Sequence, residues 1–314
     1  MLKVLLVKTS SLGDVVHNLP AVTDIRTRFP DAAIDWAVEE DYAPLVRMHP
    51  GVRRVIAVAI RRWRSRLFGA STWSEVGTLR RLFRAESYDA IIDTQGLIKS
   101  ALLARAARGR HHGFDAKSAR EPLAARFYEV KHHVARNLHA VLRNRALVAS
   151  ALGYRADAPA GCGITASTPS SGHYAVLLHS SSRADKLWPE ERWIALAREM
   201  EGRALRCVLP WGSEEEQRRS ARIASFLSNA LVPERMPIAD LTALLSGAAT
   251  VVGVDTGLTH LAAALGVPVV ALYSGSDPAL TGVYGARRAR NLGGPGLVPE
   301  VSEVSAALRE VGTQ

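Results

Sequence analysis

The residues best suited to binding or catalysis lie near position 255, where an apolar run ends in a polar turn. Residues 250–254 precede Asp255-Thr256-Gly257, and a helical pattern follows. Backbone N–H groups at a helix N-terminus bind anions such as a diphosphate, assisted by the helix dipole. Thr256 is placed to cap the helix, Gly257 lets the backbone approach a phosphate, and His260 lies on the same face. A plain helix cap and a buried core histidine are the alternative.

A second polar segment, residues 179–186, follows the apolar run 174–178. Its hydroxyls at Ser181 and Ser182, with the Lys186 ammonium, can bind a diphosphate and neutralise it as it leaves. Neither this segment nor the turn at Asp255 matches a Walker A or G-x-G-x-x-G pattern. That mismatch argues against an ATPase and a dehydrogenase.

The first half of the chain repeats this pattern near its start. The apolar run 2–7 ends in a polar turn, residues 8–13, that leads to Asp14. A carboxylate near a helix N-terminus either stabilises that helix or serves as a general base toward an acceptor hydroxyl. The sequence leaves both roles open.

Positive charge is concentrated in the first half. Residues 1–160 carry 26 Lys and Arg against 15 Asp and Glu, whereas residues 161–314 carry 14 against 15. The densest basic cluster is residues 61–66. This asymmetry predicts an anionic partner: nucleic acid, an acidic membrane surface or a phosphorylated substrate. Few aromatic residues accompany the arginines, so nucleic acid is the least favoured. A solvated basic loop is the alternative.

Strand-like and helix-like segments alternate along the chain, which predicts parallel sheets covered on both faces. The expected strands are Leu2–Val7, Ile34–Val38, Arg54–Ala59, Ala90–Asp93, Tyr174–His179, Leu205–Leu209, Thr250–Asp255 and Val267–Tyr273. The expected helices are Val15–Arg28, Ser74–Ala85, Leu97–Arg108, Asn137–Leu152, Glu190–Met200, Glu214–Leu227, Ala239–Ala248 and Leu258–Leu265.

The segment 153–172 is rich in small and polar residues and lacks periodicity. We therefore expect two Rossmann-like α/β domains, 1–155 and 173–314, joined by a linker at 156–172. Because parallel sheets bind ligands at the carboxyl ends of their strands, facing sheets would place the polar turns of both domains on one cleft.

Composition narrows the class of protein. Hydrophobic residues make up 47% of the chain and charged residues 22%, as in ordinary globular proteins. The first apolar run is far shorter than the roughly 20 residues of a membrane span and has no cleavage site after it. Cys162 and Cys207 provide neither a disulfide framework nor a zinc site. These features predict a cytoplasmic protein.

Seven motifs resemble those of the lipopolysaccharide heptosyltransferases of glycosyltransferase family 9, in particular the type that adds the first heptose. They lie at 7–14 (VKTSSLGD), 59–64 (AIRRWR), 93–100 (DTQGLIKS), 119–123 (AREPL), 185–189 (DKLWP), 209–212 (LPWG) and 254–260 (VDTGLTH). The motifs span nearly the whole chain in the expected order.

The resemblance implies a GT-B fold and transfer of L-glycero-D-manno-heptose from ADP-heptose to the Kdo sugar of Kdo2-lipid A. It implies inversion at the anomeric carbon, and neither a cofactor nor a catalytic metal. Asp14 and Lys186 are the implied catalytic residues, with Asp14 as the base. The last helix, about 300–311, would pack back on the first domain.

The resemblance also assigns the binding residues. The implied donor-binding residues are Ser181, Ser182, Lys186, Glu216 (ribose), Met236 (adenine), Asp255, Thr256, Gly257 and His260. The implied acceptor-binding residues are Ser10, Arg61, Arg62, Arg64, Gln95, Arg120, His139 and Arg143. An anionic inner-membrane surface, contacted from the cytoplasmic side, is the further expected partner; nucleic acid is not expected. The alternatives are a transferase for the second or a later heptose, and a non-catalytic protein that binds anionic surfaces.

Overall fold

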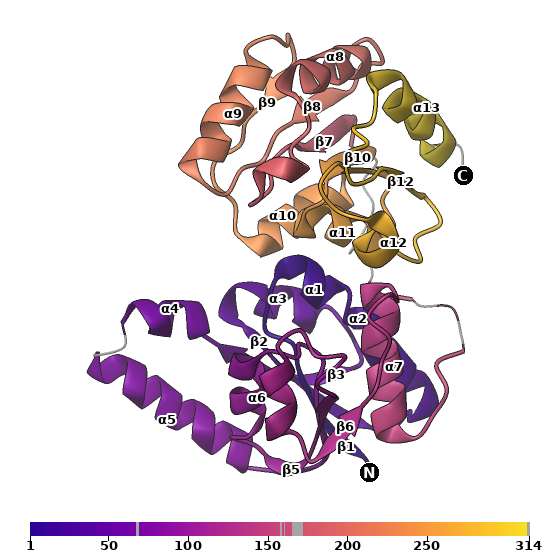
Figure 1. Ribbon diagram of the computed structural model, residues 1–314. Helices are drawn as coiled ribbons and strands as arrows, with labels where there is room; N and C mark the ends of the chain where they lie inside the picture. The colour runs from indigo at the N-terminus through magenta and orange to yellow at the C-terminus, as the bar shows by residue number, and fades with distance from the viewer. Residues whose placement is uncertain (67–68, 158, 160, 165–171, 313–314) are drawn as a thin grey trace. The chain divides into compact units, whose positions relative to one another are not determined.

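The computed structural model describes residues 1–66, 69–157, 159, 161–164 and 172–312 (Figure 1). It divides into two compact units, Met1–Gly163 and Ile164–Gln314. Each unit is an α/β fold on a six-stranded parallel sheet. This is the two-unit Rossmann-like architecture of the GT-B class. The division lies within the predicted linker 156–172, of which residues 158, 160 and 165–171 are outside the described residues.

The sheet of the first unit has the order β3-β2-β1-β4-β5-β6. Its strands are β1 (Lys3–Val7), β2 (Ala33–Glu39), β3 (Val52–Val58), β4 (Ser87–Asp93), β5 (Arg108–Phe114) and β6 (Val130–His132). The helices are α1 (Leu12–Val16), α2 (Leu19–Arg28), η1 (Glu40–Tyr42), α3 (Ala43–Arg47), α4 (Ile60–Ser65), α5 (Ala70–Arg84), α6 (Ile98–Ala104), η2 (Pro122–Phe127) and α7 (Ala140–Leu152). Strand β2 is buried along its whole length, as expected where helices cover both faces of a sheet.

The sheet of the second unit has the order β12-β11-β10-β7-β8-β9. Its strands are β7 (Tyr174–Leu178), β8 (Arg206–Val208), β9 (Ala230–Leu231), β10 (Thr250–Val254), β11 (Val269–Tyr273) and β12 (Ala289–Gly293). The helices are η3 (Ala184–Lys186), α8 (Glu190–Glu201), α9 (Glu214–Ala224), α10 (Ile238–Ser246), α11 (Gly257–Ala264), α12 (Pro278–Thr281) and α13 (Val301–Gly312). Counted within each unit, both sheets have the same doubly wound order.

Each sheet has one point at which the strand order reverses: between β1 and β4 in the first unit, and between β7 and β10 in the second. Doubly wound sheets bind ligands at this point, outside the carboxyl ends of the strands. The loops after β1 and β4 therefore form one candidate binding edge. The loops after β7 and β10 form the other.

The structure corrects the predicted elements in several places. The predictions missed α4 and the strands β5, β6, β9 and β12. Strands β5 (RGRHHGF) and β12 (ARNLG) lack an apolar run, and β6 and β9 have only three and two residues. The single helix predicted over Val15–Arg28 is wrong: α1 ends at Val16, and α2 begins with a proline in its first turn. The helix predicted to Arg108 ends at Ala104, since Arg108 begins β5.

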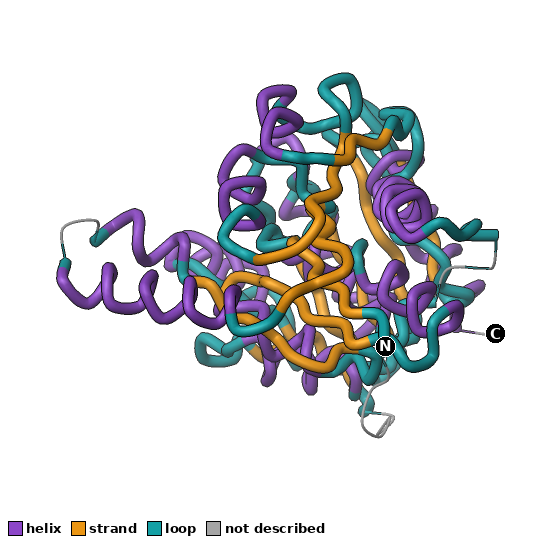
Figure 2. The backbone as a smooth tube through the Cα atoms, turned by 90° about the horizontal axis from the view of Figure 1, so that it is seen from below, coloured by secondary structure: helices purple, strands orange, loops and turns teal. Residues whose placement is uncertain are grey.

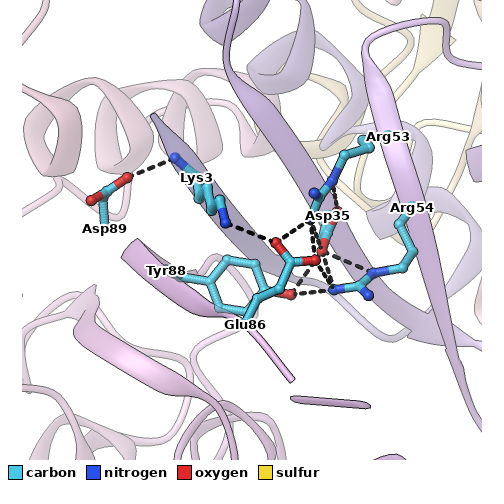
Figure 3. A network of polar contacts seen from close by, with 7 residues as sticks. All are labelled: Lys3, Asp35, Arg53, Arg54, Glu86, Tyr88 and Asp89. Atoms are coloured by element: carbon cyan, nitrogen blue, oxygen red, sulfur yellow. Dashed lines mark hydrogen bonds and ion pairs between the residues drawn. The ribbon is translucent and has the colours of Figure 1, made fainter. Parts of the chain in front are cut away.

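A polar network joins the first four strands of the first unit away from the candidate binding edge (Figure 3). Asp35 on β2 is fully buried and accepts hydrogen bonds from Arg53 Nη2 at 2.8 Å, Arg54 Nη2 at 2.6 Å and Tyr88 Oη at 2.7 Å. Glu86 binds both arginines from the other side. A buried carboxylate is tolerated only with such partners. We infer that this network is structural.

The core of the second unit is built on two tryptophans and the last helix. Trp188 and Trp193 pack edge to face, with ring centroids 5.0 Å apart, and the Trp188 indole donates to Pro299 O. Helix α13 buries Val304 and Val311 in the same core. The predicted contact of this helix with the first domain stays a prediction. Of the helices that the structure describes, none has the length and apolar character needed to cross a membrane.

Candidate active site

Asp255 is the centre of the candidate site in the second unit. It follows β10, is 7% exposed, and receives the Lys186 ammonium on Oδ2 at 2.6 Å. His260 Nε2 lies 3.3 Å from Oδ1, and the Ser276 hydroxyl donates to Oδ2. Burial by itself would raise the pKa of Asp255, but these three hydrogen bonds outweigh it and hold the pKa well below its usual value. Asp255 is therefore a permanent carboxylate that positions Lys186 and His260.

The turn after Asp255 forms the N-terminus of α11. Thr256 is the N-cap residue, and its side chain makes no capping hydrogen bond, although its carbonyl accepts from Thr259 N. The backbone N–H groups of Gly257 and Leu258, the first two residues of α11, are therefore not capped by the Thr256 side chain. Gly253 lets the helix approach this closely, because a Cβ there would lie 2.1 Å from Thr259 Oγ1. Gly257 stands first in the helix, where an anion would approach the backbone.

The loop after β7 lies beside this turn. Ser181 Oγ donates to Asp255 O at 3.4 Å, Ser182 is exposed, and Lys186 reaches Asp255 from the short helix η3. The donor residues predicted around Asp255 are thus brought together. Sequence reasoning missed Ser276, although it lies just beyond β11, where a polar residue after a predicted strand was a usable signal.

His179 braces the start of this loop and was also not predicted as a site residue. It is fully buried between the hydroxyls of Ser180 and Ser220, each 2.8 Å from a ring nitrogen. Burial lowers the pKa of His179 to about 4, so the ring is neutral near pH 7.

Glu216 and Met236 lie apart from the Asp255 cluster in the chain. Glu216 Oε2 accepts from Gly212 N at 2.7 Å and Ser213 N at 3.2 Å and completes a capping box at α9. Met236 is half-buried in the loop before α10. Their predicted contacts with ribose and adenine stay predictions. Both of these hydrogen bonds to Glu216 end on Oε2.

In the first unit, Gln95 joins the loops after β1 and β4. Its Oε1 accepts from Thr9 N at 2.6 Å and Thr9 Oγ1 at 2.7 Å, and its Nε2 donates to Ser10 O at 3.0 Å. Gln95 is buried, and these bonds use most of its amide. It therefore positions Ser10. The predicted contacts of Ser10 and Gln95 with an acceptor stay predictions.

Two buried charges beneath this junction were not predicted as site residues. Lys8 donates to Thr94 O at 2.9 Å, and Asp93 accepts from Ser100 Oγ and Tyr128 Oη, each at 2.7 Å. Burial is the main influence on both groups: it lowers the pKa of Lys8 and raises the pKa of Asp93. Their position at the ends of predicted strands could have identified them.

Asp14 lies on α1 at the same edge. Its Oδ2 accepts from Ser11 N and Ser11 Oγ, both at 3.0 Å, and lies 3.9 Å from Arg120 Nη1. Burial raises the pKa of Asp14, but the Lys8 charge, the Ser11 hydrogen bonds and Arg120 together lower it below its usual value. Asp14 is thus an ionised carboxylate near pH 7. The structure brings it together with Arg120, which is 106 residues away in the sequence.

His139 and Arg143 stand at the start of α7. His139 is buried and caps that helix, with Nδ1 accepting from Val141 N at 3.2 Å. Arg143 stacks over the Phe114 ring at 5.1 Å, and burial lowers its pKa. Both are positioned by contacts within the unit, and their predicted acceptor contacts stay predictions.

The predicted arginine cluster divides into different environments. The Arg62 guanidinium is held between Glu40 and Glu75 by four hydrogen bonds of 2.9–3.1 Å. Arg61 is exposed, 3.8 Å from Asp41, and Arg64 is exposed and makes no ion pair with another described residue. Arg61 and Arg64 therefore have charge available for an anion, whereas Arg62 braces α4 against α5. Within the described residues, no group of three or more His, Cys, Asp and Glu side chains is arranged to hold a metal.

Known proteins are similar to this chain in sequence and in fold. Residues 76–307 match the model of "Glycosyltransferase family 9 (heptosyltransferase)". Lipopolysaccharide heptosyltransferase 1 of Escherichia coli K12 is 45% identical over 291 residues, covering 90% of this chain and 91% of the relative. The protein of that name from Pseudomonas aeruginosa is 45% identical over 290 residues, covering 90% and 82%. The solved structure of the E. coli heptosyltransferase WaaC with ADP superposes with a TM-score of 0.89 at 42% identity, covering 99% of this chain and 100% of that one. The chain belongs to glycosyltransferase family 9, the heptosyltransferases.

Proposed function

We propose that the protein transfers L-glycero-D-manno-heptose from ADP-heptose to the Kdo sugar of Kdo2-lipid A, with inversion at the anomeric carbon. Relatives named lipopolysaccharide heptosyltransferase 1 support the first transfer over later ones. Solved relatives with ADP and with ADP-2-deoxy-2-fluoro heptose support the donor. The observation that carries the proposal is that Lys186 and His260 both contact Asp255, which directly precedes the start of α11, where the N-cap side chain makes no hydrogen bond.

The second unit would bind the donor. The diphosphate would lie at the start of α11, against the backbone of Thr256 and Gly257, with Ser181 and Ser182 beside it. Lys186 has a compact charge held in place by Asp255, which suits the stabilisation of negative charge as ADP leaves. Glu216 and Met236 would contact the ribose and the adenine. Asp255 itself would orient Lys186 and His260, because a carboxylate repels a phosphate.

The first unit would bind the acceptor and supply the base. A Kdo hydroxyl would attack the anomeric carbon and transfer its proton to Asp14, while the bond from that carbon to the diphosphate breaks and ADP leaves. Attack opposite the leaving group inverts the anomeric configuration. The depressed pKa of Asp14 keeps it ionised and ready to accept the proton. The anionic acceptor would be held by Arg120, Arg61 and Arg64. Its binding site would be lined by Ser10, Gln95, His139 and Arg143.

The direct test measures ADP release from ADP-heptose with purified protein. We expect release only when deacylated Kdo2-lipid A is added, and a product one heptose heavier by mass spectrometry. Deacylated acceptor already bearing one heptose should remain unchanged. Release that depends on the second acceptor and not on the first would overturn the proposal.

We further propose that the enzyme works at the cytoplasmic face of the inner membrane, as a peripheral protein attached to an anionic surface. The support is the excess of positive charge in the first unit together with a lipid acceptor.

A further inference from the structure

Helix α5 presents a basic face that the proposed reaction does not use. The helix follows α4, and Figures 1 and 2 both show the two helices extending beyond the edge of the sheet of the first unit. Thr72, Leu79 and Phe83 are buried on the inner face, and the last two belong to the core cluster of that unit. The opposite face is exposed and carries Arg80, Arg81 and Arg84, which we call the α5 arginine face.

The charge of the α5 arginine face is not neutralised by nearby acids. Glu75, on the same helix, accepts from Arg62 and from Trp63 Nε1. Glu86, just beyond the helix, is held by Lys3, Arg53 and Arg54. Among the described residues, the arginines of this face make no ion pair; Arg81 donates to the Thr78 hydroxyl at 2.9 Å. Three cations therefore remain available to an anionic partner.

An aromatic side chain lies on the same stripe. Trp73 is 65% exposed and stands seven residues before Arg80 and eleven before Arg84, so the three share one side of the helix. A surface hollow of about 360 Å³ is lined by Gly77, Ala85 and the α5 arginine face. Basic side chains are attracted to anionic lipid headgroups, and tryptophan is enriched at the membrane–water interface. Nucleic acid would favour several stacked aromatics, and one is present here.

We propose that the α5 arginine face, with Trp73, docks the protein on an anionic lipid bilayer. The arginines would bind lipid phosphates in the hollow, and Trp73 would enter the headgroup region. The link from Glu75 to Arg62 and Trp63 holds α5 against α4, so the surface is preformed. The proposal rests on the proposed function, since a lipid-anchored acceptor gives the enzyme a reason to lie on a membrane.

The test is co-sedimentation with vesicles of phosphatidylcholine containing about one third phosphatidylglycerol, compared with pure phosphatidylcholine. Arg80→Gln with Arg81→Gln and Arg84→Gln should weaken binding to the anionic vesicles about 100-fold, because each basic residue at the surface contributes roughly one tenfold step or less. A matched variant removes three exposed arginines elsewhere: Arg47→Gln, Arg203→Gln and Arg206→Gln. It should bind nearly as well as the parent protein.

Tryptophan fluorescence gives a second readout. Anionic vesicles should shift the emission to shorter wavelength in the parent protein, and Trp73→Phe should abolish the shift while leaving most of the sedimentation. A shift that persists in Trp73→Phe would overturn the assignment of this surface. Equal losses of vesicle binding in the two triple variants would also overturn it. So would a result in which the variant of Arg80, Arg81 and Arg84 loses binding to an oligonucleotide but binds anionic vesicles as well as the parent protein does.

Turnover of the soluble, deacylated acceptor separates this proposal from the proposed function. Both triple variants should retain it, since none of their residues belongs to the candidate active site. If the parent protein binds vesicles through this face but shows no turnover, the reaction is wrong and the docking surface stands.

Discussion

Replacing Asp14 by asparagine isolates the charge of the proposed base. The backbone N–H and the hydroxyl of Ser11 both donate to the same carboxylate oxygen of Asp14, Oδ2, at 3.0 Å. The amide oxygen of asparagine can accept the same pair. Charge-assisted hydrogen bonds become neutral ones, which lowers stability by about 1 kcal/mol. Loss of general-base assistance should lower kcat about 10²- to 10⁴-fold, or about 3–5 kcal/mol in the barrier.

The assay combines kcat with donor affinity. Asp14→Asn should lower kcat by that factor, while calorimetric titration of ADP should give the parent affinity, because the proposed donor residues lie in the other unit. Asp115→Asn is the matched control: Asp115 also follows a strand, accepts from Ser118 N at 2.7 Å, and has a lowered pKa. A kcat within fivefold of the parent for Asp14→Asn would refute the base assignment, as would an equal loss in the control.

The remaining predictions concern charge and packing around the two candidate edges. Lys8→Met removes the charge that most lowers the pKa of Asp14, so this pKa should rise and the acid limb of the pH profile of kcat/KM should move to higher pH. The control Lys99→Met, at an exposed site, should leave the pH profile unchanged. Asp255→Asn breaks the ion pair with Lys186. It should raise the donor KM at least tenfold and lower the free energy of unfolding by roughly 3 kcal/mol. A donor KM within twofold of the parent value would contradict the proposed role of Asp255. Arg61→Ala with Arg64→Ala should raise the acceptor KM far more than the donor KM, and equal rises would mean that the pair is structural. Asp35→Asn should lower the free energy of unfolding by roughly 2 kcal/mol, because its partner arginines are partly exposed, and should leave both KM values unchanged.

Local patterns predicted much of the fold. Uninterrupted apolar runs predicted the central strands β1, β7, β10 and β11, because strands covered on both faces must be apolar at every position. The edge strands β6, β9 and β12 escaped prediction, because they are short or polar; β12 pairs with a strand on one side only and reads ARNLG. The edge strand β3 was predicted, because its sequence VRRVIAV is largely apolar. The positions of polar residues directly after the runs also predicted where a ligand would bind.

The sequence by itself determined which residues directly follow the central strands, including Asp255, and which lie at the start of the next helix, including Asp14. That information is local, because helix and strand periodicity and the turn after a strand depend on neighbouring residues. Only the tertiary structure decided what those residues touch. Long-range packing sets the order of the strands, and this order places Gln95 against Thr9 and Lys186 against Asp255. The same packing leaves Arg61 and Arg64 open to an anion and encloses Arg62 between two glutamates, a difference that three nearly adjacent arginines cannot show in sequence.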